Sequence, residues 1–201
     1  MKKLIVGFIF FLGSYSSFAA SGQTYARFDY GLGQFTNDKF DSFNTKPNGS
    51  TFGASIGSKM NYVELGLFYR KMSLQAEINH DGTANKITHD GKTFGIDMNV
   101  FLNKYLSLKL GYAFNSYKEK LETPVSTQAL NSIKTLYGLE ENYSKSNVFY
   151  GANVDVFGAK KIDLYASVLH FPMGDSKSTT TAQLGIRIYM DLKLSDFFGS
   201  N

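Results

Sequence analysis

The amino-acid sequence predicts an all-β protein, an eight-stranded antiparallel up-and-down transmembrane β-barrel with a short helix in its third long loop. Three observations support this fold class. Eight segments alternate apolar and polar residues with the period of two that a strand requires, and their connections are short and long by turns. The chain begins with an export signal, yet it contains no run of about 18 apolar residues that could cross a membrane as a helix. Any membrane crossing must therefore use strands.

The N-terminus has the pattern of a secretory signal peptide. Lys2 and Lys3 precede an apolar run at positions 4–12 (LIVGFIFFL), which is too short to span a bilayer. Small residues at Ser17 and Ala19 favour cleavage after Ala19. We expect residues 1–19 to form a signal peptide rather than a buried strand, and residues 20–201 to form one domain.

Composition excludes several other classes. The full chain has 21 basic and 17 acidic residues, so removal of Lys2 and Lys3 leaves 19 against 17, a formal charge of +2. No run of Lys and Arg is present, and we expect no nucleic-acid partner. The sequence has no cysteine, which excludes a disulfide framework, a thiolate metal site and a lipoprotein anchor within it.

The eight alternating segments and their connections follow a regular order. The segments lie at positions 24–34, 51–59, 62–71, 92–102, 105–117, 147–157, 162–170 and 180–192. Three connections are very short (60–61, 103–104 and 158–161), and four are longer (35–50, 72–91, 118–146 and 171–179). Because consecutive antiparallel strands place alternate connections at opposite ends, the short turns lie at one end with both termini. Bacterial outer-membrane barrels have this asymmetry, and an even strand count closes the sheet without edges.

The alternation alone leaves open which face points inward, because a soluble lipocalin-like barrel has its apolar face inside. Small residues on the polar face favour the opposite arrangement, since the interior of an eight-stranded barrel is just wide enough for side chains. These are Gly31, Gly33, Gly53, Gly57, Gly66, Gly95, Gly111, Gly151 and Gly185, beside Ser55, Asn99, Ser107 and Asn153. The other face is bulky, as in Phe28, Tyr30 and Leu32. We therefore predict that the apolar face points outward.

This orientation places a set of charged residues in the lumen. They are Arg27, Asp29, Lys59, Glu64, Arg70, Asp97, Lys109, Asp155, Asp163, Arg187 and Asp191. Charges in a narrow, dry interior require partners and hydrogen bonds, so we expect a mixed network that plugs the lumen. In the stretch YLSLKLGYAF, Leu108 should then face lipid while Lys109 points inside.

The export signal, eight alternating strands and charged lumen resemble the small outer-membrane β-barrel proteins of the OmpA/OmpX-like family over the whole mature chain. The resemblance implies an outer-membrane barrel domain at residues 20–201, reached through the periplasm of a Gram-negative bacterium. It also implies a monomer in contact with outer-membrane lipid and lipopolysaccharide, with long loops open to an external protein or surface ligand. The family usually ends its last strand with an aromatic residue, whereas this chain continues past LGIRIYMDL, where Phe197 or Phe198 could serve.

The histidines give little sign of catalytic or metal chemistry. His80 and His89 lie in the fragments NHDG and THDG, whose Asn, Asp and Gly favour two turns in an exposed loop over a metal site. His170 and Ser176 bracket a loop near the external rim, where some eight-stranded barrels act on lipid A. A nucleophile there needs a base within reach and a third group that orients the base. We predict no catalytic residue, no metal and no cofactor.

The longest connection contains a predicted helix at positions 127–137. Ala129, Ile133, Leu136 and Tyr137 recur at helical spacing, Ser126 or Thr127 can cap the start, and Gly138 can end it. We favour packing of this helix against its own barrel over a lid, a membrane contact or a partner-binding element.

The sequence thus favours a non-enzymatic outer-membrane barrel with a charge-plugged lumen, which stabilises the envelope or presents external loops. A narrow OmpW-like channel for small or apolar solutes is the first alternative, and a lipid A-modifying acyl enzyme is the second.

Overall fold

The computed structural model describes residues 23–37, 46–80, 83–122, 127–139, 141–174 and 177–191. The predicted signal peptide, the capping residue Ser126, the rim residue Ser176 and the C-terminal Phe197 and Phe198 lie outside these ranges.

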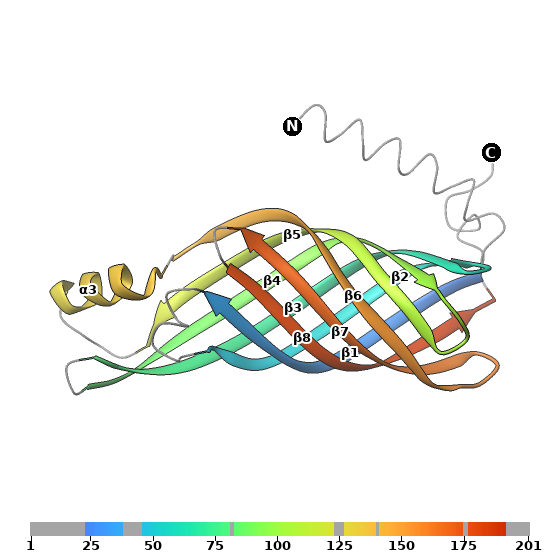
Figure 1. The fold of residues 1–201 in the computed structure, drawn as a ribbon, viewed down its shortest axis with the longest axis horizontal. Coiled ribbons are helices and arrows are strands. Elements are labelled where there is room, and N and C mark those ends of the chain that lie inside the picture. The colour runs from blue at the N-terminus through green and yellow to red at the C-terminus, as the bar shows by residue number, and fades with distance from the viewer. Residues whose placement is uncertain are drawn as a thin grey trace, which may run out of the picture.

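The chain forms a closed eight-stranded antiparallel barrel, as predicted (Figure 1). Each strand pairs with its neighbours in the sequence, and β1 closes the barrel against β8 from the pair Thr24–Met190 to the pair Asn37–Lys177. The elements are β1 (Gln23–Asn37), β2 (Asn48–Met60), β3 (Val63–His80), β4 (Thr83–Phe101), β5 (Leu106–Leu121), α3 (Thr127–Tyr137), β6 (Tyr143–Gly158), β7 (Ile162–Gly174) and β8 (Lys177–Met190).

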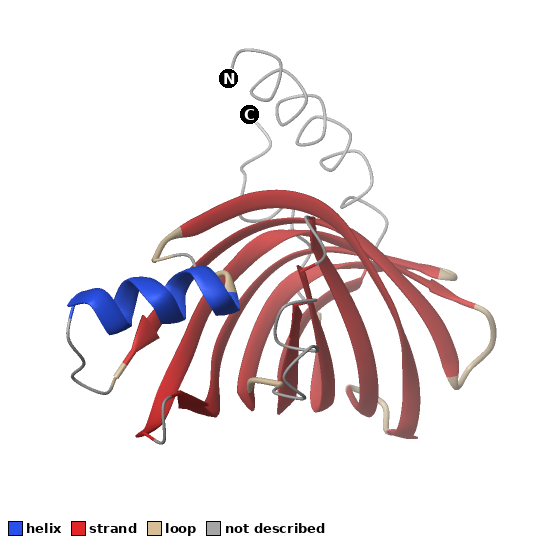
Figure 2. Cartoon of the chain, turned by 60° about the vertical axis from the view of Figure 1, so that its left-hand side comes forward, coloured by secondary structure: helices blue, strands red, loops and turns tan. Residues whose placement is uncertain are grey.

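Short turns close one end of the barrel, and α3 lies at the opposite end (Figures 1 and 2). At the β2–β3 turn Asn61 adopts a left-handed backbone with φ 43°, a conformation that asparagine tolerates better than most residues. At the β4–β5 turn the side-chain oxygen of Asn103 accepts hydrogen bonds from the backbone N–H groups of Tyr105 and Leu106, at 2.8 and 2.9 Å. The three connections predicted to be short all lie at the end opposite α3, as expected. Two of the four connections predicted to be long, at 72–91 and 171–179, shrink to positions 81–82 and 175–176 between paired strands.

The outer surface carries an apolar belt over the part of the barrel nearest the short turns. Outward side chains such as Phe28, Leu32 and Leu184 are exposed, the last two at 70%. Large apolar residues that stay out of a barrel's interior and cover its outside indicate hydrocarbon as the surrounding solvent. The prediction of an outward apolar face is confirmed.

The strands are longer than the sequence pattern predicted. The prediction of a long connection at 72–91 is wrong, because β3 and β4 extend into it. β3 and β4 remain paired up to His80 and Thr83. Beyond Arg70 the pattern reverses, because Met72 and Leu74 are buried inside while Gln75 is exposed outside. In this part of the barrel apolar side chains point inward and polar side chains point outward, as in a water-soluble protein. The outward polar residues therefore gave this segment the composition of a loop.

Interior glycines make room for large interior side chains. A Cβ added to Gly66 would lie 2.5 Å from the hydroxyl of Tyr25, and one added to Gly91 would lie 2.4 Å from the ring of Tyr117. The small residues on the polar face therefore do not leave an open channel, since aromatic rings from other strands fill the lumen beside them.

The helix α3 is confirmed at Thr127–Tyr137, and Gly138 ends it with φ 63°. The backbone N–H of Leu139 then bonds back to the carbonyl of Lys134 at 3.0 Å, which satisfies one of the last carbonyls of the helix. Among the described residues no helix has the length and apolar character needed to cross a membrane.

Candidate functional site

The lumen is the candidate site, and its first layer is a buried charge network near the short turns. Arg27 of β1 lies at its centre, with 2.6 Å between its Nη2 and Asp97 Oδ2. Its Nη1 lies 3.7 Å from Glu64 Oε2, and its Nε donates to Ser55 Oγ at 2.9 Å. Arg27 draws these partners from three other strands because alternate residues of every strand point into the same narrow interior.

Lys109 of β5 also binds Asp97, with 2.9 Å between Nζ and Oδ2. It is 5% exposed, whereas its neighbour Leu108 is 46% exposed on the outer surface. Asp97 therefore receives two cations. Each stays charged at low energetic cost only while the carboxylate is present.

Glu64 joins this layer to a second arginine. Arg187 of β8 lies 3.1 Å from Glu64 Oε1 through its Nε, and its Nη1 lies 3.1 Å from Asp163 and 3.3 Å from Asp155. The hydroxyl of Tyr189 donates to Asp163 Oδ2 at 2.9 Å. One continuous network of ion pairs and hydrogen bonds thus crosses the lumen.

Neutral polar groups add hydrogen bonds to the network. Asn99 Nδ2 donates to Glu64 Oε2 at 2.8 Å, and Asn153 Nδ2 donates to Asn99 Oδ1 at 3.0 Å and to Ser107 Oγ at 3.1 Å. Sequence reasoning treated Asn99 and Asn153 only as small residues. It overlooked Tyr189, although the parity of the β8 segment would have placed that side chain inside.

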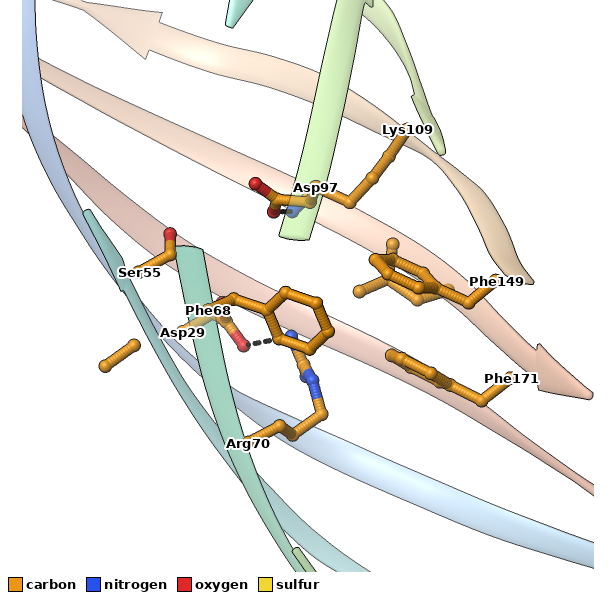
Figure 3. A pocket seen from close by; sticks show the side chains of 10 residues that line it. Asp29, Ser55, Phe68, Arg70, Asp97, Lys109, Phe149 and Phe171 are labelled. Atoms are coloured by element: carbon orange, nitrogen blue, oxygen red, sulfur yellow. Dashed lines mark ion pairs between the residues drawn. The ribbon is translucent and has the colours of Figure 1, made fainter. Parts of the chain in front are cut away.

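A second layer lies above the network and combines one ion pair with aromatic rings. Arg70 Nη2 lies 3.0 Å from Asp29 Oδ1. A dashed line marks this ion pair in Figure 3. Phe149 stacks on Phe171 with 4.7 Å between ring centroids, and Phe68 meets Phe149 edge-on at 5.1 Å. The cavity among these side chains has a volume of about 10 Å³, which is room for about one water molecule.

A third layer closes the end of the barrel that carries α3. We call it the cap cluster, and its buried members are Phe35, Met72, Leu74, Ile78, Ile87, Tyr117, Ile133 and Met173. Ile133 is the contribution of α3 and is fully buried. The packing of α3 on its own barrel, which the sequence favoured, is therefore present in the structure.

Polar contacts also hold the segments around the cap cluster together. Lys177 Nζ donates to the carbonyl of Gly138 at 3.4 Å, and the Tyr143 hydroxyl donates to the carbonyl of Met173. Lys134 Nζ lies 2.5 Å from Glu141 Oε1. This hydrogen bond holds the pKa of the Glu141 carboxyl below its usual range, with a smaller electrostatic contribution from Lys118.

His89 lies within the cap, which corrects the prediction that it sits in an exposed turn. It is 2% exposed, its Nδ1 lies 3.2 Å from Glu119 Oε1, and its ring stacks on Phe35 at 4.1 Å. The reason is that β3 and β4 continue past the membrane belt and carry His89 inward. Within the described residues no three His, Asp or Glu side chains come together as metal ligands.

Solved structures with a similar fold are small outer-membrane barrels. Ail, the attachment invasion locus protein of Yersinia pestis, in complex with the heparin analogue sucrose octasulfate, is 16% identical, with 85% of this chain and 99% of that chain covered and a TM-score of 0.50. The fold is that of a small outer-membrane β-barrel. Neisserial surface protein A is 11% identical over 83% of this chain and 97% of that chain, with a TM-score of 0.44. The N-terminal barrel domain of Pseudomonas aeruginosa OprF is 15% identical over 84% and 99%, with a TM-score of 0.42. No family model and no curated protein sequence matches the chain.

Of the eleven charged residues predicted for the lumen, the barrel places ten inside or at its mouth. They are Arg27, Asp29, Lys59, Glu64, Arg70, Asp97, Lys109, Asp155, Asp163 and Arg187. Asp191 is the exception, because its side chain is 74% exposed and lies 2.5 Å from Lys161 at the outer rim. β8 ends at Met190, so Asp191 lies outside the strand. The alternation of inward and outward side chains holds only within a strand and does not predict where Asp191 points.

His170 of β7 faces outward. Its Nδ1 lies 2.9 Å from Thr180 Oγ1, and its ring lies 5.2 Å from that of Tyr150. A nucleophile and base of this kind need a third group to orient the histidine. None of the ion pairs among the described residues involves His170.

Proposed function

We propose that this protein is a non-enzymatic outer-membrane barrel whose lumen is closed at several levels, and that it stabilises the envelope or presents its external end to partners. The observation that supports this most strongly is the bridging position of Glu64. It contacts Arg27 from one side and Arg187 from the other, so that charged side chains span the whole width of the lumen.

The three layers differ in chemistry, and a solute would have to pass all of them. Opening the charge network separates buried ions, which costs several kcal/mol for each ion left without a partner. The cavity in the aromatic layer, at about 10 Å³, has room for about one water molecule. The cap cluster would have to expose apolar side chains to water. These features argue against a narrow channel for small solutes.

The proposal of a non-enzymatic role is supported by the surroundings of the histidines. His89 is enclosed by the rings of Phe35 and Tyr117, and its Nδ1 lies against the carboxylate of Glu119 deep within the cap cluster. His170 meets Thr180 on the outer face without a carboxylate among the described contacts. A lipid A acyl enzyme would need a nucleophile, a base and an orienting group in one place.

Single-channel recording of the purified, refolded chain in planar bilayers tests the closed lumen. We expect no stable openings of porin size, and the same result after residues 123–142 are replaced by a short Gly-Ser linker, because the charge network remains. Stable openings in the unaltered chain would favour the channel alternative. Mass spectra of lipid A from cells with and without the protein should be identical, and a change in acylation would favour the enzyme alternative.

A further inference from the structure

Four lysines form a cationic arc on the outer surface of β3, β4 and β5, just beyond the apolar belt. The last belt row on these strands is aromatic, since Tyr69 lies opposite Phe94, which in turn lies opposite Phe114. The arc occupies the next outward positions of β3 and β4 and, beyond Ser116, the two outward positions after it on β5. All four of its side chains are exposed. It consists of Lys71, Lys92, Lys118 and Lys120.

The strand register concentrates these charges. Lys71 directly faces Lys92 across β3 and β4. On β5, Lys118 lies opposite Asp90, and Lys120 is the next outward residue. Residues directly opposite each other in an antiparallel pair have Cβ atoms about 5 Å apart, and like charges in that position are destabilising.

The described neighbours compensate part of this charge, since the Glu141 carboxylate lies within the electrostatic reach of Lys118. None of the four lysines forms an ion pair with another described residue. The one acidic residue within the arc is Asp90, whose Oδ1 accepts a hydrogen bond from Ser73 Oγ at 2.8 Å. In the next row Lys86 and Glu122 pair with each other at 3.4 Å.

The arc covers only part of the barrel's circumference. On β5 Ser116 precedes the two lysines, whereas no lysine, arginine or carboxylate is the first outward polar residue beyond the belt on the other five strands. The first outward polar residues on those five strands are Gln34, Ser50, Ser146, His170 and Thr180. The lysines are therefore a local feature of β3 to β5 and not a general property of the barrel rim.

We propose that the cationic arc binds the phosphate groups of a glycolipid in the outer leaflet, with Lys71 and Lys92 as its centre. The inference rests on the proposed residence in the outer membrane. The arc begins one outward position past the aromatic row that ends the belt, the depth at which lipid headgroups lie. Lysine stems can lie along the aromatic rings while their ammonium groups reach the headgroups. Because the strand register places Lys71 opposite Lys92, their ammonium groups repel each other, and an anion bound between them offsets that repulsion.

A matched pair of double variants tests the site. Lys71→Gln with Lys92→Gln removes two charges from the arc. Lys104→Gln with Lys160→Gln removes two exposed charges from the turns at the opposite end. The full chains are refolded in neutral detergent and titrated, with native mass spectrometry, against bisphosphorylated lipid A and against the same lipid after removal of its phosphates. Heat-modifiability on gels and protease protection in vesicles report folding and insertion for every variant.

We expect the unaltered chain to prefer the phosphorylated lipid. The arc variant should lose roughly fivefold in affinity for each lysine removed, and the turn variant should lose nothing. Adding Lys118→Gln should weaken binding further, and high salt should weaken it in the unaltered chain. The dephosphorylated lipid should bind all variants equally.

Three results would overturn the inference. The two lipids could bind equally well, or both double variants could lose affinity equally. Alternatively, sucrose octasulfate could bind the arc in vesicle-inserted protein while phosphorylated lipid does not, which would assign the arc to a soluble polyanion. Failure to insert into vesicles would instead contradict the proposed membrane function, so the two failures are distinguishable.

Discussion

Arg27 of β1 and Asp97 of β4 form an ion pair across the lumen, with 2.6 Å between Arg27 Nη2 and Asp97 Oδ2. Strands β2 and β3 lie between their two strands in the sheet, so the contact forms only when the sheet closes. Both side chains are 1% exposed. Both buried charges therefore gain this partner only when the barrel has closed.

Asp97→Asn should destabilise the barrel strongly. It leaves Arg27 and Lys109 without a shared carboxylate, and breaking a buried ion pair from one side costs about 3–5 kcal/mol. Asp191→Asn is the matched control, because its pair with Lys161 is exposed and should change stability by less than about 1 kcal/mol. Urea titrations of both variants in lipid vesicles measure the difference. Equal stability of the two variants would show that the buried ion pair contributes no more to the stability of the barrel than an exposed one.

Leu108 and Lys109 are adjacent in sequence and should respond oppositely to substitution by arginine. Leu108→Arg places a charge on the outer face of the belt, where an arginine costs roughly 2–4 kcal/mol at the bilayer midplane and about 0–1 kcal/mol near an interface. Lys109→Arg keeps the charge beside Asp97 and should cost much less. Refolding titrations compare them directly, and a larger defect for Lys109→Arg would mean that the barrel is inside out.

Ile133→Ala should loosen α3 without unfolding the barrel. It removes the side chain that α3 contributes to the cap cluster, a truncation that typically costs about 2–5 kcal/mol in a packed core. Leu136→Ala is the control, since Leu136 is exposed on the same helix. Trypsin should cleave the Ile133 variant at Lys134 while heat-modifiability stays unchanged. Cleavage at the same rate in both variants would show that α3 is not docked through Ile133.

The sequence predicted the lumen residues well within each strand, because the alternation of side chains has a period of two and a local pattern is enough. It failed at Asp191, which follows the end of β8. It also left open which carboxylate Lys109 binds. That partner is Asp97, and the choice depends on how the sheet closes, which no local pattern encodes.

The length of the strands could not be predicted for a different reason. From Glu64 to Ile78 the inward face of β3 keeps one parity, but its residues change from polar to apolar after Arg70. The change marks where lipid gives way to water outside, a property of the surroundings and not of the chain. His89 was misplaced for the same reason, because its strand was taken for an exposed loop.

A cysteine scan along β3 tests the central claim most directly, and the chain has no cysteine of its own to interfere. Single cysteines at positions 63–78, labelled with a small fluorophore in vesicle-inserted protein, are exposed in turn to a lipid-soluble and a water-soluble quencher. We predict that Val63, Leu65, Leu67 and Tyr69 respond to the lipid-soluble quencher, that Lys71, Ser73, Gln75 and Glu77 respond to the water-soluble one, and that the even positions respond to neither. Lipid quenching at the even positions, or no change of quencher after Tyr69, would contradict a barrel that is apolar outside within the membrane and apolar inside beyond it.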